Sequence, residues 1–468
     1  MVFSSLIFVF LFLPVTLLIY YISPMRIRNA VLLAASLVFY AWGEPVYIFL
    51  MIFSTVFDYV NGILIDRYRH RKVIARGVLT LSMIGSLGIL GFFKYAGFVL
   101  DNINSLFNLH LQAADLPLPV GISFYTFQTM SYIIDVYRRK VPVQKNLIAF
   151  SAYVTMFPQL VAGPIVKYED IAEQLAKRTV TLDRFGEGAE LFIRGLAKKV
   201  LLANNIGLLW ASSKAVPAAE LSVLSAWLGI IAFTFQIYFD FSGYSDMARG
   251  LGKMIGFEFM ENFNYPYISR SITEFWRRWH ISLGSWFREY IYIPLGGNRA
   301  GKGKQLRNLA VVWFITGLWH GASWNFILWG LYFGLFVTLE KLMLLKQLQH
   351  LPAFVSHVYT LMIVIIGWVF FEFEHLPAAL TFIGTMFGAG THGFADNRAL
   401  YDLSTNALLL LLLAVCATPF PSKALARFRT RFARSGTFAA LAIYFIFIVA
   451  STAYLVNATY NPFLYFRF

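Results

Sequence analysis

Two histidines are the residues in this sequence best suited to proton transfer. His280 lies in the segment Ser271–Arg299, and His320 lies in Leu318-Trp319-His320-Gly321. A neutral imidazole titrates near working pH and can take a proton from a hydroxyl as that hydroxyl attacks. His320 follows an uncharged run, and Gly321 allows close backbone approach. We therefore predict a catalytic role for His320, with a hydrogen-bonded core histidine as the alternative. For His280, orienting a substrate and structural packing are both open.

Arginines surround His280 in the sequence. Arg277, Arg278 and Arg288 would suit a phosphate-rich donor on the cytoplasmic side, while membrane topology and contact with anionic lipid are the alternative roles. Wound as one helix, Ser271–Arg299 places its tryptophans and His280 on one arc and the arginines on the other. This pattern predicts an amphipathic helix at a membrane interface.

Other chemistry has weaker support. Asp240 and Asp246 are carboxylates in or near the membrane, where a proton relay competes with helix capping and pairing to a buried arginine. The single cysteine, Cys416, lies in an apolar run and disfavours disulfides or a cysteine-borne acyl group. No metal site is expected, because the other histidines lack ligand spacing.

The composition is that of a multi-pass membrane protein. Of 468 residues, 58% are hydrophobic and 13% charged, and the mean hydropathy is +0.63. About eleven apolar segments approach the ~20 residues that a spanning helix needs. The net charge of +15 is expected to come from Lys and Arg in cytoplasmic loops rather than from nucleic-acid binding. We predict an all-α bundle that forms one domain over residues 1–468.

The apolar segments also suggest how the chain crosses the membrane. The run Asn146–Gly163 is broken by Pro158, which predicts a re-entrant or short helix and a central funnel or tunnel. Basic loops alternate with loops free of Lys and Arg, which places both chain ends outside. The first five predicted spans are Val2–Ile22, Ala30–Trp42, Val46–Ile65, Val78–Leu100 and Val120–Tyr137. The further apolar segments are Ala189–Trp210, Val223–Phe241, Asn308–Leu345 as two crossings, Val358–Phe373, Ala378–Phe387, Ser404–Phe420 and Thr437–Val456.

Long motifs resemble the membrane-bound O-acyltransferase (MBOAT) family, in particular its bacterial branch that O-acetylates exported polysaccharides. The motifs are Gly121–Arg139, Phe157–Pro164, Tyr238–Tyr267, Ser271–Arg299, Leu318–Gly330 and Tyr460–Phe468. By this resemblance the family's catalytic histidine falls on His320 and its second functional histidine on His280. The resemblance also implies a helical bundle with a central tunnel.

The resemblance implies an activity and its partners as well. An acetyl group from a cytoplasmic thioester, acetyl-CoA, would pass across the bacterial inner membrane to a polysaccharide such as alginate, through a periplasmic acetyltransferase. No tightly bound cofactor is expected. The aromatic segment Tyr460–Phe468 would dock that partner or anchor the last helix. Two rival hypotheses are a proton-coupled transporter or flippase, in which His320, Asp240 and Asp246 relay protons, and a scaffold of a polymer export complex.

Overall fold

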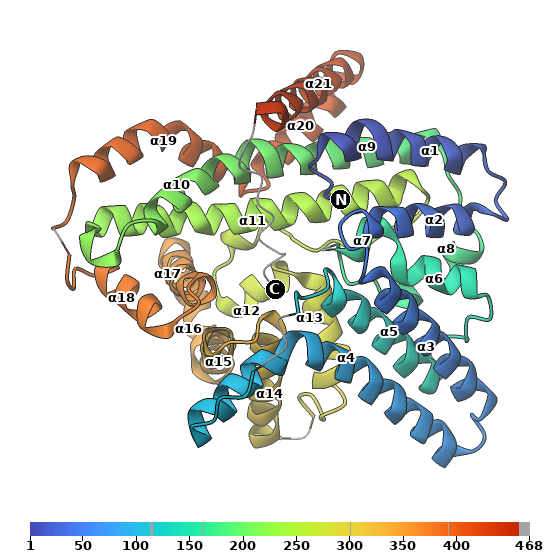
Figure 1. Cartoon of the computed structure of the whole chain (residues 1–468). Helices are drawn as coiled ribbons and strands as arrows, with labels where there is room; N and C mark the ends of the chain where they lie inside the picture. Colours follow the sequence, from blue (N-terminus) through green and yellow to red (C-terminus); the bar gives the residue numbers. More distant parts are fainter. Residues whose placement is uncertain (113–115, 162, 300, 392, 458–468) are drawn as a thin grey trace. The chain divides into compact units, whose positions relative to one another are not determined.

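The structure of the protein is a computed structural model that describes residues 1–112, 116–161, 163–299, 301–391 and 393–457. Every regular element in these ranges is an α, 3-10 or π helix, and they contain no strand (Figure 1). The predicted all-α class is confirmed. The aromatic segment Tyr460–Phe468, which the sequence assigns to partner docking or membrane anchoring, lies outside the described residues.

The chain forms two compact units, which are described separately. The first comprises Met1–Phe192 and Ser245–Met260, and the second comprises Ile193–Tyr244 and Glu261–Phe468. Helices α9 and α11 contribute residues to both units. The single domain expected over residues 1–468 stays a prediction.

In the first unit, α3 packs against α4, α5 and α6. Buried polar groups join two of these helices: Asp58 of α3 accepts a hydrogen bond of 2.7 Å from the hydroxyl of Ser82 on α4. The elements that lie wholly in this unit are a π turn Phe8–Phe12, α1 Leu13–Ile22, α2 Arg28–Ala41, α3 Ile48–Arg67, α4 Lys72–Phe107, α5 Ile122–Tyr137, α6 Leu147–Thr155, α7 Phe157–Leu160 and α8 Tyr168–Ala176.

In the second unit, α14 packs closely against α15. A Cβ atom on Gly317 would lie 2.3 Å from the Phe326 carbonyl oxygen, so only glycine permits this approach. The remaining α-helices are α9 Leu182–Ala197, α10 Asn204–Lys214, α11 Val223–Met254, α12 Ile272–Arg278, α13 Ile281–Phe287, α14 Lys302–His320, α15 Trp324–Leu339, α16 Leu345–His350, α17 Ala353–Glu372, α18 Leu376–Met386, α19 Asn397–Cys416, α20 Phe420–Arg431 and α21 Ala433–Asn457. Short 3-10 and π turns lie at Lys198–Ala203, Ala218–Glu220, Pro266–Ile268, Arg288–Tyr292 and Glu340–Leu344.

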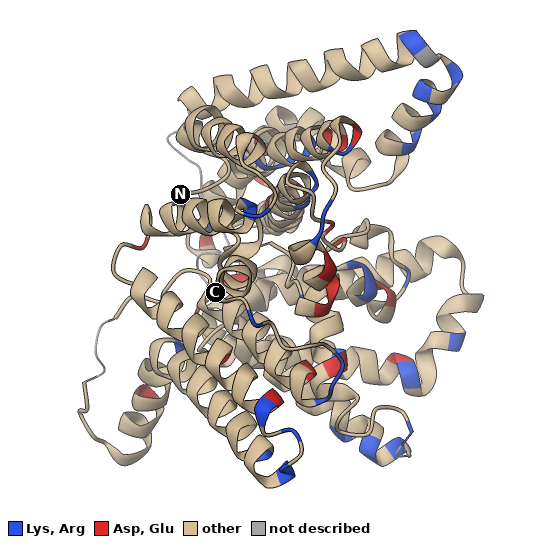
Figure 2. Cartoon of the chain, turned by 90° about the vertical axis from the view of Figure 1, so that its right-hand side faces the viewer, with Lys and Arg blue, Asp and Glu red and all other residues tan. Residues whose placement is uncertain are grey.

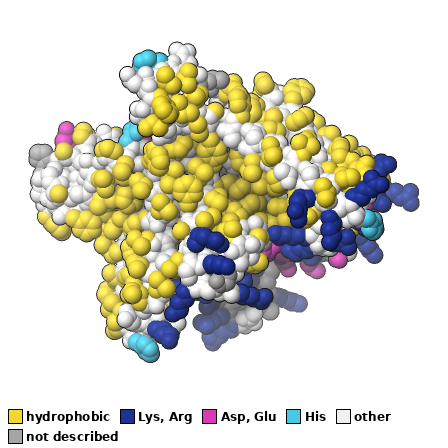
Figure 3. All heavy atoms as spheres, turned by 90° about the horizontal axis from the view of Figure 1, so that it is seen from below, with side chains coloured by type: hydrophobic (Ala, Val, Ile, Leu, Met, Phe, Trp, Pro, Cys, Tyr) yellow, Lys and Arg dark blue, Asp and Glu magenta, His cyan; other side chains and the backbone are white. Residues whose placement is uncertain are grey.

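Several helices are long and apolar enough to cross a membrane, so the chain is a multi-pass membrane protein. Lys and Arg gather near helix ends and in loops (Figure 2), and groups of them interrupt wide hydrophobic areas of the surface (Figure 3). Among the described residues seven helices meet the criterion: Ile48–Arg67, Lys72–Phe107, Val223–Met254, Trp324–His350, Ala353–Glu372, Asn397–Cys416 and Arg434–Asn457. Three shorter apolar helices are Phe8–Ile22, Arg28–Ala41 and Leu376–Met386.

The predicted interruption near Pro158 is present. Helix α6 ends at Thr155, Met156 adopts φ −49° and ψ 114°, and the single turn of α7 follows with Pro158 in its first turn. Proline tolerates a first helical turn, where its missing N–H would have no partner. The central funnel or tunnel inferred from this interruption stays a prediction.

The prediction of one amphipathic helix through Ser271–Arg299 is wrong. The helix stops after Arg278, Trp279 is extended, and His280 takes a left-handed conformation before α13 begins. Neither residue is a glycine or a proline, so the break left no signal in the sequence. Two short helices therefore replace the expected one. The separation of aromatic and basic side chains onto two faces of one helix does not apply across the break.

Candidate active site

Two side chains hold the N-terminus of α12. Ser271 is the N-cap, and its hydroxyl oxygen accepts a 3.0 Å hydrogen bond from the Glu274 backbone N–H. The fully buried Glu340 accepts two more, from the backbone N–H groups of Ile272 at 2.6 Å and Thr273 at 2.7 Å. A carboxylate here satisfies donors that lack helical partners and complements the helix dipole. Glu340 therefore fixes the start of the helix that carries Arg277.

The break after α12 is held by Asn262. His280 has φ 46°, a conformation that costs a non-glycine residue about 1 kcal/mol or more. Asn262 Oδ1 accepts hydrogen bonds from the Ser282 backbone N–H at 3.1 Å and hydroxyl at 2.9 Å, and it lies 3.2 Å from His280 Nδ1. The backbone N–H of Ile281 donates to the Asn262 carbonyl at 3.0 Å. One asparagine thus stabilises both sides of the break.

These contacts also fix the tautomer of His280. The Ser282 backbone N–H can only donate, so the Asn262 atom beside it is the amide oxygen. Because that oxygen can only accept, the ring proton of His280 is on Nδ1 and the lone pair is on Nε2. Burial lowers the pKa of His280 to about 3. His280 is therefore a neutral imidazole near pH 7, with Nε2 as its proton-accepting atom.

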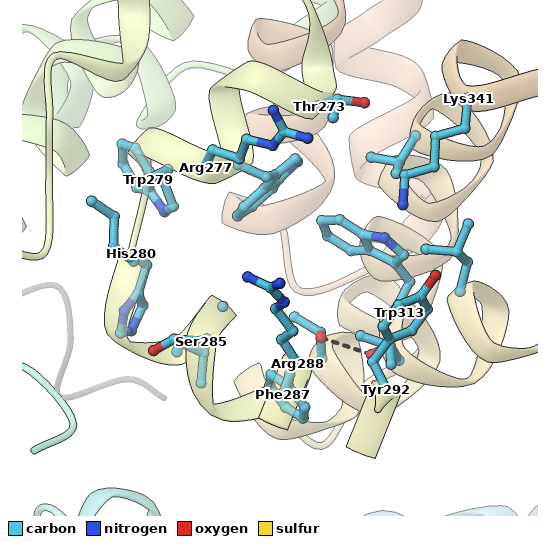
Figure 4. Close-up of a pocket in the computed structure, with 18 of the residues that line it drawn as sticks. Thr273, Arg277, Trp279, His280, Ser285, Phe287, Arg288, Tyr292, Trp313 and Lys341 are labelled. Atoms are coloured by element: carbon cyan, nitrogen blue, oxygen red, sulfur yellow. Dashed lines mark hydrogen bonds between the residues drawn. The ribbon is translucent and has the colours of Figure 1, made fainter. Parts of the chain in front are cut away.

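His280 lines a cavity of about 560 Å³ in the second unit (Figure 4). This volume falls in the range typical of sites for small molecules and cofactors. Its walls come from α12, α13, the turn after α13, α14, and the end of α15. The lining residues are Thr273, Trp276, Arg277, Trp279, His280, Ile281, Leu283, Gly284, Ser285, Phe287, Arg288, Tyr292, Asn298, Leu309, Val312, Trp313, Thr316, Val337 and Lys341.

Three positively charged side chains surround the cavity: Arg277, Arg288 and Lys341 (Figure 4). None of the three forms a salt bridge with an acidic side chain in the described part of the chain. Arg277 and Lys341 are close enough for their charges to repel each other. The cavity lining is thus positively charged, which favours an anionic ligand.

Arg278 has different surroundings from its neighbour. Its Nε donates to Glu274 Oε1 at 2.9 Å, one of its terminal nitrogens donates to the Asn264 carbonyl at 3.1 Å, and it is not among the residues that line the cavity. Of the three arginines expected at a donor site, the structure brings together Arg277 and Arg288. The expected separation of arginines from aromatic residues is wrong, since both arginines share the cavity with tryptophans.

Aromatic rings form much of the cavity wall. Trp276 and Trp313 meet edge to face with centroids 5.0 Å apart, and the Lys341 ammonium lies 5.7 Å from the centre of the Tyr292 ring. Tyr292 in turn donates a hydrogen bond to Asn298. Aromatic faces beside cations suit a ligand that combines a flat ring with negative charge.

His320 lies beside this cavity rather than on its lining. It is the last residue of α14 and is 4% exposed, and its ring packs edge to face on Trp319 at 4.9 Å and Trp329 at 4.8 Å. Trp319 also contacts His280, with ring centroids 6.2 Å apart, and Thr316, one turn before His320, lines the cavity. The two histidines therefore contact the same tryptophan, and their catalytic roles stay predictions.

The two aspartates both have basic neighbours on helical elements. Asp240 of α11 lies 2.6 Å from the ammonium of Lys199, and both side chains are almost fully buried. Asp246 lies 3.6 Å from a guanidinium nitrogen of Arg249, one turn later on the same helix. Pairing to a buried arginine is one of the roles that the sequence leaves open for these aspartates, and the buried partner of Asp240 is a lysine.

Sequence reasoning missed Glu340, Lys341 and Asn262. Glu340 and Lys341 form a charged pair that interrupts an otherwise apolar run, and such a pair inside a span is itself a signal of function. Asn262 has no comparable signal, because an asparagine 18 positions before His280 matches no helical or ligand spacing. The described residues contain no group of three or more His, Cys, Asp or Glu side chains that could hold a metal ion.

Known proteins resemble this chain along most of its length. Residues 138–371 match the membrane-bound O-acyltransferase family, MBOAT. A protein of Azotobacter vinelandii named probable alginate O-acetylase AlgI is 45% identical over 89% of this chain and 84% of its own length. The protein of the same name from Pseudomonas putida is 42% identical over the full length of both chains.

A relative with another named acceptor is more distant. The peptidoglycan O-acetyltransferase of Helicobacter pylori is 34% identical over 83% of this chain and 80% of its own length. The matched family segment contains α12, α13, α14, the residues that line the cavity, and also His320. With this site and these similarities, the chain belongs to the membrane-bound O-acyltransferase family.

Proposed function

We propose that this protein takes acetyl groups from acetyl-CoA and passes them on for the O-acetylation of an exported polysaccharide, with alginate as the first candidate. The relatives named alginate O-acetylase and peptidoglycan O-acetyltransferase support acetyl transfer onto a polysaccharide. The higher identity to the alginate enzymes favours that polymer over peptidoglycan.

The observation that carries the donor assignment is the cavity with three cations that form no salt bridge with the described acidic residues. Acetyl-CoA brings phosphate groups, which Arg277, Arg288 and Lys341 would bind. It also brings an adenine ring, for which Trp313 and Tyr292 offer aromatic faces. A thioester extending from this cavity past Trp319 would bring its carbonyl carbon toward the two histidines.

In the proposed reaction, His320 accepts the proton of the attacking hydroxyl group, which belongs to whichever acceptor first receives the acetyl group. The hydroxyl oxygen bonds to the thioester carbonyl carbon, the carbon–sulfur bond breaks, and the thiolate takes the proton from the imidazolium to leave as coenzyme A. The C-terminal end of α14 carries the negative pole of the helix dipole, which stabilises a transient positive charge on His320. His280, neutral and fixed by Asn262, would orient the acetyl group or the acceptor through Nε2.

We further propose that the protein resides in the bacterial inner membrane, uses donor from the cytoplasm, and passes the acetyl group to a periplasmic acetyltransferase that completes the transfer to the polymer. The apolar helices support the membrane location. No tightly bound cofactor is needed for this chemistry.

The test uses the purified protein in lipid nanodiscs with radiolabelled acetyl-CoA. His320→Ala should remove donor turnover while the protein stays folded, and His110→Ala, at an exposed position, should behave as wild type. A second arm adds polymer with and without a periplasmic extract, and label should enter the polymer efficiently only with the extract. Turnover by His320→Ala at the wild-type rate would contradict the proposed base, and rapid polymer acetylation without extract would contradict the two-component route.

A further inference from the structure

The first unit contains a second cavity, of about 610 Å³, whose lining is rich in positive charge. It lies at the end of α3, the start of α4 and the loop after α5. Its charged lining residues are Asp66, Arg69, Lys72, Arg139, Lys140 and Lys145. Five cations thus face one carboxylate. The acyl-transfer chemistry proposed above uses none of them.

Two of the five cations have acidic partners. Arg69 lies 3.6 Å from Asp66 in an exposed pair, and Lys140 lies 2.6 Å from Glu169. The other three, Lys72, Arg139 and Lys145, form no salt bridge with the described residues. Exposed pairs such as Arg69 with Asp66 contribute little and neutralise the field incompletely. A net positive cavity remains, and an anion would be its natural occupant.

Arg139 contributes its charge to the cavity from a backbone conformation that is unfavourable for a residue other than glycine. The helix α5 ends in a Schellman motif: the Lys140 N–H donates to the Asp135 carbonyl at 2.8 Å and the Arg139 N–H donates to the Val136 carbonyl at 3.1 Å. The residue at the left-handed position of this motif is usually glycine. Here it is Arg139, with φ 61°. Strained backbone of this kind concentrates at functional positions.

The position of the cavity favours a lipid as the source of the anion. It opens where α3 ends and α4 begins, and both helices are candidate membrane spans. Val73, next to Lys72, is 86% exposed, so apolar surface for an acyl chain adjoins the cations. Basic pockets between spanning helices on the cytoplasmic side bind anionic headgroups, and the first turn of α4 adds the positive end of a helix dipole.

We infer that this cavity is a binding site for the phosphodiester headgroup of an anionic phospholipid, held by Lys72, Arg139 and Lys145. The shared chemistry is a phosphate oxygen against two or three cations, which a soluble phosphate compound could also offer. The inference does not depend on the proposed acyl transfer, because it concerns residues of the other unit and a different ligand.

The test compares the double variant Lys72→Gln/Arg139→Gly with Arg76→Gln. Arg76 lies one turn after Lys72 on α4 and is exposed, but it does not line the cavity, so it controls for loss of charge near the membrane surface. Each protein is extracted from nanodiscs of phosphatidylcholine with a fraction of phosphatidylglycerol, and retained phosphatidylglycerol is measured by native mass spectrometry. We expect about tenfold weaker retention in the double variant and wild-type retention in Arg76→Gln.

Arg139→Gly alone separates binding from folding. Glycine relieves the left-handed strain, so this variant should unfold at the wild-type temperature or slightly above it, while its lipid retention falls. Lys145→Gln, in an exposed loop, should lower retention without a folding effect. Equal retention in wild type and cavity variants, or an equal loss in Arg76→Gln, would overturn the site. Adenosine 3′,5′-bisphosphate serves as the soluble phosphate compound in a parallel binding measurement. Cavity variants that lose its binding but retain phosphatidylglycerol as the wild type does would overturn the lipid as the ligand.

Discussion

Arg277 and Arg278 are consecutive, yet only Arg277 lines the cavity, while Arg278 Nε lies 2.9 Å from Glu274 Oε1. The difference follows from the helix geometry of α12, where successive side chains point about 100° apart. Glu274, one turn earlier, is placed to pair with Arg278. A cation with a carboxylate partner has less to gain from an anionic ligand than one without.

This contrast predicts the kinetics of a matched pair of variants. Arg277→Gln should raise the KM for acetyl-CoA about tenfold or more, because a charge-assisted hydrogen bond to phosphate is lost, and leave kcat nearly unchanged. Arg278→Gln should change KM by less than about twofold, because this arginine does not line the cavity and already has Glu274 as its partner. Steady-state kinetics in nanodiscs measure both. Equal defects in the two variants would mean that the arginines act through general charge or folding instead of donor contact.

Glu340 is predicted to act as a positioning residue. Glu340→Gln leaves one oxygen to accept from two backbone N–H groups, so one buried donor loses its partner at a cost of about 1–3 kcal/mol. We expect a lower unfolding temperature and a lower kcat, since α12 carries Arg277 and precedes His280. The exposed Glu374→Gln is the control. Melting curves and turnover rates check the prediction, and wild-type values for Glu340→Gln would show that α12 keeps its start without the carboxylate.

The sequence identified most elements but not the site geometry. Apolar runs of span length predicted helices such as α17 and α21 within a few residues, because that pattern depends only on local composition. The left-handed His280 could not be predicted, since it depends on Asn262, a tertiary contact. Because of this break, tryptophans and arginines that one continuous helix would place on opposite faces line the same cavity. Shared walls from α12, α14 and α15 also required packing that no local pattern encodes.

The number of membrane-spanning helices is a second feature that the sequence alone does not determine. The segment predicted as Ala189–Trp210 is part of a continuous helical stretch that contains Lys198 and Lys199. Whether such a helix spans the membrane depends on how its charges are paired, and the partner of Lys199 is more than one helix away in sequence. Composition alone could not identify Asp240 as that partner.

The pair of Lys199 and Asp240 separates a structural role from a proton relay. Lys199→Met or Asp240→Leu alone should destabilise the protein by about 3–5 kcal/mol, because each change breaks the buried ion pair and leaves one of its two charges. The double variant Lys199→Met/Asp240→Leu should recover most of that stability and retain acetyl transfer. Unfolding in detergent and donor turnover are the two measurements. A double variant that is folded but inactive would mean that the pair takes part in the reaction and is not only structural.

The buried His280 predicts how acid destabilises the protein. Burial lowers its pKa from 6.5 to about 3, so between these values the unfolded chain binds a proton at this position and the folded chain does not. Folding stability should therefore fall as pH decreases from about 6.5 toward 3, by up to about 1.4 kcal/mol per pH unit from this group.

His280→Asn removes the titrating ring, and asparagine tolerates the left-handed backbone better than alanine does. The unfolding temperature of wild type should drop more steeply than that of His280→Asn between pH 6.5 and 4.5, while both should be flat with respect to this group between pH 7 and 8. Parallel pH profiles would mean that His280 takes up a proton in the folded protein, and its proposed role as a neutral group in the site would then fail.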